Sequence, residues 1–249
     1  MIWSRTGGAG TGPLLVMLHG LGATAEVFAE VERELSDNWS GGWLVVDLPG
    51  HGRSGWDPPY SFAGLADAVR PLLPHDRDLV LLGHSLGGVV ALHLADGAAP
   101  APSAVIALGV KVRWTEEDLG RAAKIAERPV LTLASREEAV DRYLKLAGLS
   151  GLVDATDQAT DAGVVAATEG WRVAQDPATF AVGAPDMTGL LAGAVCPVAM
   201  ARGEHDPMVS DRDLAALVPD PVTLRGLGHN AHVEDPGAVL AVVRRVHGP

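Results

Sequence analysis

The chain has few of the features that mark several classes of protein. Its 249 residues include one cysteine, Cys196, which excludes an internal disulfide framework and gives no cysteine metal cluster. Lysine and arginine number 19 against 31 acidic residues, so the net charge of −12 disfavours nucleic acid and anionic membrane surfaces as partners. No apolar run approaches the ~20 residues of a membrane helix. We therefore expect a small-molecule partner and no membrane association.

The start of the chain also lacks a recognisable targeting signal. Met1 to Arg5 is not a charged segment followed by an apolar one, so we expect no signal peptide and a cytoplasmic protein. The composition is 47% hydrophobic, which at this length suffices for a large core in a single α/β domain with an insertion.

Short apolar runs alternate with helical patterns along the chain. Strands are predicted at 14–18, 43–46, 79–82, 104–108, 198–201 and 222–224, and helices at 24–35, 61–73, 86–95 and 236–246. Alternating strands and helices predict βαβ units, and strands that are apolar throughout predict burial on both faces. We expect an α/β fold with a doubly wound, mostly parallel sheet flanked by helices.

The pattern changes between residues 111 and 194. Helical segments at 116–127, 137–147 and 159–168 replace the strands, and the acidic run 116–118 after Thr115 predicts a capped helix N-terminus. We predict a core domain formed by 1–110 and 195–249, with 111–194 inserted as a helical cap.

The strongest functional signal is the segment GHSLGG at 83–88, which follows a predicted strand and precedes a predicted helix. A strand that reverses sharply into a helix holds the central serine in strained backbone geometry, and only glycine fits two residues to either side. The pattern predicts that Ser85 projects from the sheet edge as a nucleophile.

Three further segments follow predicted strands. HGLG at 19–22 has glycines that let backbone N–H groups approach a ligand and hold an oxyanion. GEHDP at 203–207 places an acid, and GLGHNAH at 226–232 places histidines, after later strands. The carboxyl ends of parallel strands build the sites of open α/β sheets, so these segments are expected to face one crevice.

With these segments, the sequence resembles the α/β-hydrolase fold family, whose triad has the chain order serine, acid, histidine. The resemblance spans nearly the whole chain and includes the loop DLPGHGRS at 47–54, similar to the family's D-x-P-G-x-G-x-S loop. It implies that Ser85 is the nucleophile, His229 the general base and Asp206 the group that orients His229. It also implies that the backbone N–H groups of Leu21 and Leu86 form the oxyanion hole.

Several neighbouring residues have alternative interpretations. Glu204 and Asp211 compete with Asp206, and His232 competes with His229 and is interpreted as a pocket or packing residue. Candidate pocket residues, some of which are equally compatible with plain core or structural positions, are His19, Gly20, His84, Trp114, Trp171, Met187, Met208 and His232. No metal or cofactor is expected.

The resemblance implies an enzyme of the cap-bearing, esterase-like branch. We expect a serine hydrolase that cleaves a small or medium apolar carboxylic ester, or a related thioester or lactone, through an acyl-Ser85 intermediate. Hydrolysis of a carbon–carbon bond and acyl transfer remain open. The predicted cap and the loop 207–209 look apolar, and no basic cluster for a phosphopantetheine or coenzyme A group is evident. The sequence does not predict an oligomeric state.

Two functions of other kinds also remain. A hydrolase scaffold could serve as a non-catalytic binding or receptor protein, because a fold does not determine a function. Alternatively, Gly20, Gly22 and Ala25 satisfy a G-x-G-x-x-A dinucleotide fingerprint, and Asp47 ends the next strand at the position of a ribose-binding acid. That pattern would indicate an oxidoreductase that binds NAD(P) or a flavin.

Overall fold

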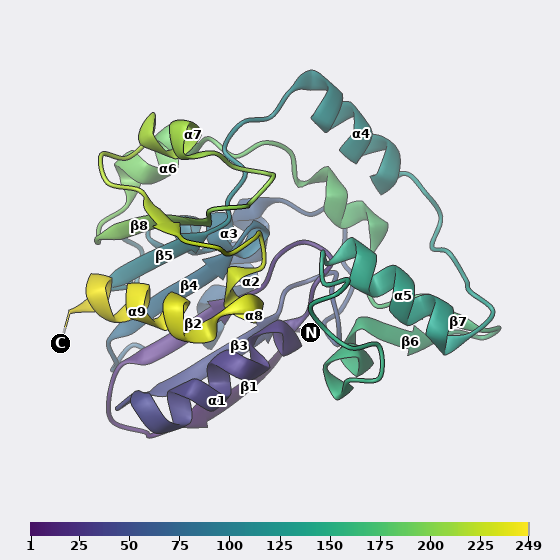
Figure 1. Cartoon of the computed structure of the whole chain (residues 1–249), viewed down its shortest axis with the longest axis horizontal. Coiled ribbons are helices and arrows are strands. Elements are labelled where there is room, and N and C mark those ends of the chain that lie inside the picture. The colour runs from purple at the N-terminus through teal and green to yellow at the C-terminus, as the bar shows by residue number, and fades with distance from the viewer. Residues whose placement is uncertain (249) are drawn as a thin grey trace.

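The computed structural model describes residues 1–248 and contains a seven-stranded sheet with the order β1-β3-β2-β4-β5-β8-β9 (Figure 1). The strands are β1 (Trp3–Gly8), β2 (Leu14–Leu18), β3 (Gly42–Asp47), β4 (Leu79–His84), β5 (Ala104–Leu108), β8 (Val198–Gly203) and β9 (Val222–Leu224). Only β1 runs antiparallel to its neighbour within this sheet. The predicted doubly wound α/β fold is confirmed.

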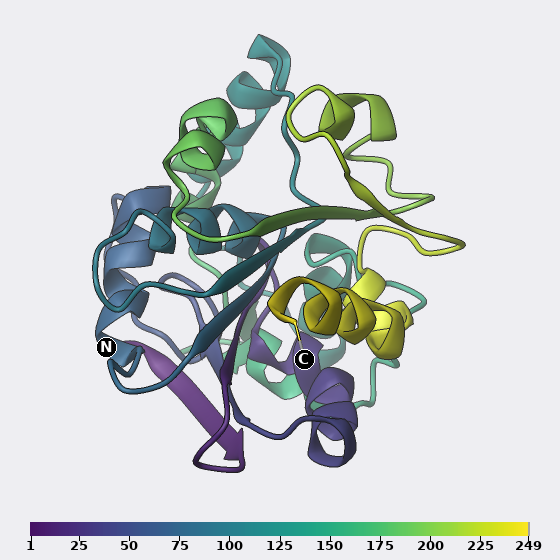
Figure 2. The same cartoon turned by 90° about the vertical axis from the view of Figure 1, so that its left-hand side faces the viewer.

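The central strands are buried on both faces because helices cover both sides of the sheet (Figure 2). Leu15 and Met17 of β2 point into one core, which contains α1 (Ala29–Asn38) and α9 (Pro236–His247). Leu14, Val16 and Leu18 of the same strand point into the other core. That core contains α2 (Phe62–Val69), α3 (Leu86–Leu94), α6 (Met187–Gly193) and α7 (Asp211–Ala215). Side chains that alternate between two cores explain why these strands read as unbroken apolar runs.

Residues 116–173 of the segment between β5 and β8 lie on the right-hand side in Figure 1, whereas α6 of the same segment lies at the upper left beside α7. The segment contains α4 (Glu116–Ala126), α5 (Arg136–Leu146), a hairpin of β6 (Val164–Ala166) and β7 (Trp171–Val173), and α6. Helix α4 begins at the predicted Thr115 cap, whose hydroxyl accepts a hydrogen bond from the Asp118 amide. Helix α4 has no buried residue, whereas α5 packs into the same core as α1 and α9. The division into a core domain and a cap at 111–194 stays a prediction, and α6 within that range packs against α3.

One predicted helix of this segment is wrong. Within the predicted range 159–168, residues 159–163 belong to the 3₁₀ helix η3 (Gln158–Gly163) and residues 164–166 form strand β6, so no α-helix is present there. A Cβ atom at Gly163 would lie 2.5 Å from the ring of Tyr143 on α5, so the backbone at Gly163 is in direct contact with α5. Val164 then enters the core in an extended conformation, which suits a β-branched residue.

The remaining short elements are the 3₁₀ helices η1 (Ala25–Phe28), η2 (Arg70–Leu72) and η4 (Pro177–Val182), and the helix α8 (Ala231–Glu234). Within residues 1–248, no helix combines the length and the apolar character that a bilayer crossing requires.

Candidate active site

Ser85 occupies the turn between β4 and α3 in a strained backbone conformation. Its φ of 50° and ψ of −113° make it the one non-glycine residue with positive φ in the described chain. The Ser85 amide donates to the carbonyl of Leu108 on β5 at 2.8 Å, which ties the turn to the neighbouring strand. Strain of this kind costs of order 1–3 kcal/mol and persists only where the surroundings enforce it.

The glycines on either side of Ser85 allow the turn to form. A Cβ atom at Gly83 would lie 2.2 Å from the carbonyl oxygen of Gly87. A Cβ atom at Gly87 would lie 2.1 Å from the carbonyl oxygen of Leu18, at the end of β2. Both contacts are with backbone atoms that no side-chain rotation can move, so the spacing of glycine, serine and glycine is a steric requirement here.

Asp206 and His229 meet across two loops that follow β8 and β9. His229 Nδ1 donates to Asp206 Oδ2 at 2.9 Å, because a carboxylate oxygen can only accept. The other carboxylate oxygen accepts from the Met208 amide at 2.8 Å, and the Asp206 side chain is fully buried. The bond to Asp206 assigns the proton of a neutral His229 ring to Nδ1 and leaves Nε2 as an acceptor.

The two competing acids lie elsewhere. The Glu204 carboxylate accepts from the Gly226 amide at 2.8 Å and supports the loop that carries His229. The Asp211 carboxylate pairs with Arg202 and accepts from the Thr223 hydroxyl, each at 2.6 Å. Of the three acids, the structure therefore pairs Asp206 with His229.

His19 fixes the orientation of the peptide between Gly20 and Leu21. Its Nε2 accepts from the Leu48 amide at 2.9 Å, so Nδ1 carries the proton and donates to the Gly20 carbonyl at 2.8 Å. Burial lowers the pKa of the His19 imidazole, which keeps it neutral at pH 7. Because a peptide unit is planar, holding its carbonyl oxygen also sets the direction of the Leu21 N–H. Leu86 begins α3, where the first N–H groups lack helical acceptors.

Two more buried histidines lie behind the turn. His84 Nε2 donates to the carbonyl of His229 at 3.0 Å, which links β4 to the loop after β9. The His232 ring lies 4.4 Å from the His84 ring and 5.0 Å from Phe28, and neither of its nitrogens has a partner within the described residues. Burial holds the pKa of His84 well below its ordinary value and lowers the pKa of His232 to about 3.

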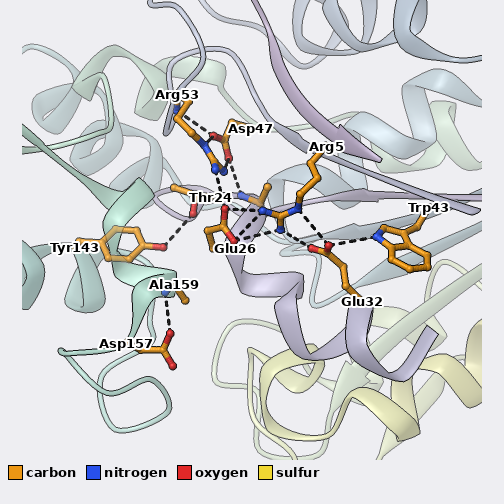
Figure 3. A network of polar contacts seen from close by, with 11 residues as sticks. Arg5, Thr24, Glu26, Glu32, Trp43, Asp47, Arg53, Tyr143, Asp157 and Ala159 are labelled. Atoms are coloured by element: carbon orange, nitrogen blue, oxygen red, sulfur yellow. Dashed lines mark hydrogen bonds and ion pairs between the residues drawn. The ribbon is translucent and has the colours of Figure 1, made fainter. Parts of the chain in front are cut away.

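A charged network holds the loop after β3, as Figure 3 shows. Asp47 is fully buried and accepts from the Ala25 amide at 2.7 Å and from Arg53 Nε at 2.7 Å. Burial alone would raise the pKa of Asp47, but the Arg53 guanidinium and the backbone amides hold it below its ordinary value. With its oxygens occupied, this carboxylate is not available to a ribose hydroxyl, which removes the support for a dinucleotide site at Gly20 and Gly22.

A cavity of about 370 Å³ opens beside Ser85 and His229. Six other residues that the sequence analysis singled out line it: Gly20, Leu21, His84, Leu86 and Met208 on the side of the sheet, and Trp114 from the inserted segment. Lining residues that the sequence analysis did not single out are Ala23, Phe62, Val89, Val110, Lys111, Lys145, Leu146, Ala147, Gly148, Phe180, Val182 and Pro185. No local motif marks these residues, because they meet only when the inserted segment packs over the sheet.

Four predicted pocket residues lie outside this lining. His19 and His232 are buried behind the loops that they support, and Met187 packs into the core beside α3. Trp171 of β7 exchanges backbone hydrogen bonds with Leu133, and this pairing adds Leu133 to the edge of the β6–β7 hairpin. These four residues therefore do not line the cavity, contrary to the prediction. His19, His232 and Met187 are packed in the interior, and the strand pairing of Trp171 places it away from the cavity.

In the described part of the chain, no group of three or more histidine, cysteine, aspartate or glutamate side chains is arranged to hold a metal ion.

The family model of the alpha/beta hydrolase family matches residues 15–242, and the chain belongs to this family. Two curated relatives are named pimeloyl-[acyl-carrier protein] methyl ester esterase. The protein from Pseudoalteromonas atlantica is 39% identical over 93 residues, and the protein from Edwardsiella ictaluri is 45% identical over 95 residues. These matches cover 36% and 38% of this chain, and the chain spans about a third (34%) of the length of each relative.

Solved structures match over almost the whole chain. E-2-(acetamidomethylene)succinate hydrolase superposes with a TM-score of 0.78 at 25% identity, covering 98% of this chain and 93% of that chain. The family assignment and this similarity agree with the mostly parallel, helix-flanked sheet described above.

Proposed function

We propose that the protein is a serine hydrolase that cleaves carboxylic esters through an acyl-Ser85 intermediate. The observation that carries the proposal is the strained Ser85 turn at a largely apolar cavity, whose lining also includes a histidine paired with a buried carboxylate. A serine hydroxyl is a poor nucleophile unless a neighbouring imidazole takes its proton. The names of the curated relatives support ester cleavage.

In the proposed mechanism, Ser85 Oγ attacks the ester carbonyl while His229 Nε2 accepts the hydroxyl proton. The Asp206 carboxylate stabilises the imidazolium that forms. His229 then returns the proton to the leaving alcohol, and a water molecule that it activates hydrolyses the acyl-enzyme. The amides of Leu21 and Leu86 hold the oxyanion, and donors of this kind contribute about 2.7–4 kcal/mol each in comparable enzymes.

The largely apolar cavity favours a small or medium apolar acyl group next to the scissile bond. Phe62, Val89 and Val110 come from the sheet side of its wall, and Phe180 and Val182 come from the inserted segment. A volume of about 370 Å³ lies within the ~300–1,000 Å³ range of small-molecule sites. Thioesters and lactones present the same carbonyl to Ser85 and remain within the proposed class.

The test compares wild type with Ser85→Ala on p-nitrophenyl esters of graded acyl length. We expect kcat/KM to fall by at least 10³-fold in the variant, because removal of the nucleophile leaves only binding and oxyanion stabilisation. A fluorophosphonate probe followed by peptide mass spectrometry should label Ser85. Activity that falls less than tenfold, or an unlabelled Ser85 beside a reactive control hydrolase, would contradict the proposal and favour a binding protein.

A further inference from the structure

A second cavity of about 450 Å³ adjoins the catalytic one inside the inserted segment. Leu146 and Phe180 line both cavities, so these two side chains form the boundary between them. The second wall includes Ile125 of α4 and the exposed apolar residues Val130 and Leu131. Each cavity alone has the volume of a small-molecule site, and together they could accommodate an elongated substrate.

The charges around the two cavities are of one sign. Lys111 and Lys145 line the catalytic cavity, and Arg128 and Arg142 line the second one. No acidic residue lines either cavity in the described chain, although aspartate and glutamate make up 31 of the 249 residues. Acidic side chains gather instead around a separate cavity of about 570 Å³ beside α1. We call these four lysine and arginine side chains the cationic wall. The composition of a chain with a net charge of −12 does not explain why the charged residues that line the two cavities are all cationic.

The arginines of the second cavity have no anionic partner among residues 1–248. Neither Arg128 nor Arg142 forms an ion pair or a side-chain hydrogen bond there. Lys145 of the catalytic cavity is likewise without an ion pair in this part of the chain, whereas Lys111 pairs with Asp118 at 2.9 Å. Arg142 and Lys145 are three residues apart on α5, so they share one helix face with Leu146. The cationic side chains therefore follow α5 from one cavity to the other.

We propose that the second cavity binds a negatively charged group at the end of the substrate remote from the scissile bond. The anion would be a carboxylate or a phosphate, which guanidinium groups bind through charge-assisted hydrogen bonds. The apolar part of the substrate then lies past Leu146 and Phe180 and beside Ser85. This inference rests on the proposed ester hydrolysis. The sequence analysis noted no basic cluster for a phosphopantetheine or coenzyme A group, and the four cationic lining residues gather only in the folded chain.

The test uses matched p-nitrophenyl esters of equal chain length. One series has a methyl group at the far end of the acyl chain, a second has a carboxylate, and a third has a phosphate. We expect kcat/KM for a charged series to exceed that of the neutral series by about tenfold, equivalent to ~1.4 kcal/mol. The advantage should begin only at the chain length that reaches the second cavity. The series with the larger increase in kcat/KM over the neutral series shows whether the cavity binds a carboxylate or a phosphate.

Variants assign the preference to the cavity. In the double variant Arg128→Gln, Arg142→Gln, the ratio of charged to neutral kcat/KM should fall by about tenfold. Arg121→Gln is the matched control, because Arg121 lies on exposed α4, pairs with Glu117 and lines neither cavity. It should keep the wild-type ratio. Circular dichroism of each variant checks that it has folded.

The outcomes separate the two proposals. If wild type cleaves neutral esters in a Ser85-dependent manner but shows no charge preference, the second-cavity inference is overturned and the proposed function stands. A preference that is equal at every chain length, or that the double variant retains, would also overturn it, because long-range attraction to the cationic surface would explain both results. If no ester in any series is cleaved, the proposed function itself fails.

Discussion

Acidification should destabilise the fold strongly because of the buried histidines around the site. Burial lowers the pKa of both His51 and His232 to about 3, whereas an unfolded histidine titrates near 6.5. Between these values the unfolded chain binds protons that the folded chain does not. Stability contributed by the neutral rings is therefore complete above pH 6.5 and is lost as the pH falls toward 3.

The magnitude follows from proton linkage. Lowering the pH from 7 to 5 costs about 2 kcal/mol for each histidine that stays neutral in the folded state, or about 4 kcal/mol for these two. Burial also lowers the pKa values of His19 and His84, so both act in the same direction. A typical domain has 5–15 kcal/mol of stability, so the loss would be a large fraction of the total.

The assay is urea unfolding, followed by circular dichroism at pH 7, 6 and 5, for wild type and His232→Leu. Leucine fits the apolar contact with Phe28 and has no nitrogen to protonate. The variant should lose about 2 kcal/mol less than wild type between pH 7 and 5. His75→Gln is the control, because the exposed His75 side chain is in water before and after unfolding. Equal losses in wild type and His232→Leu would refute the reasoning, since His232 would then be protonated in the folded protein.

Two further predictions concern single positions in the site. Gly87→Ala should destabilise the protein by more than ~3 kcal/mol in urea unfolding or abolish activity, because its Cβ would overlap the Leu18 carbonyl. Gly120→Ala on α4, with open space around it, should stabilise the protein by up to ~1 kcal/mol in the same assay. A folded and fully active Gly87→Ala would show that the turn can relax. Asp206→Asn should lower kcat by ~10³–10⁴-fold in the ester assay, whereas the kcat of Glu204→Gln should stay within about twofold of wild type. Equal effects of the two substitutions on kcat would contradict the role assigned to Asp206.

The sequence predicts the buried strands well because their signal is local. The limits of β2, β5 and β9 agree with the predicted ranges to the residue. The helix start after Thr115 also follows from adjacent residues, since a hydroxyl that caps an acidic first turn needs no tertiary partner. The turn at Ser85 is another local feature, because the serine and the two glycines that permit it lie within five residues.

Two features that depend on distant partners were not predicted. Strand β1 is polar, and its Arg5 side chain pairs with Glu26 and Glu32, more than twenty residues away (Figure 3). Edge strands with one exposed face have a weaker hydrophobic pattern in the sequence than strands that are buried on both faces. The same reasoning explains why the cationic wall was not predicted, since its four side chains are spread over 35 positions from Lys111 to Lys145 and come together only around the two cavities of the folded chain.

The buried histidines connect the stability of the fold to the geometry of the site. His19 accepts a hydrogen bond from Leu48 through its unprotonated Nε2 and holds the Gly20 carbonyl through Nδ1–H, so protonation of Nε2 would remove the acceptor for the Leu48 amide and one of the two bonds that orient the ring. His84 donates to the His229 carbonyl, and its other nitrogen faces Gly20 without a partner in the described chain. Both rings are neutral because they are buried. As the pH falls below 6.5 the unfolded chain takes up protons first, so stability should decline before protonation reaches the oxyanion loop and the histidine loop of the folded protein.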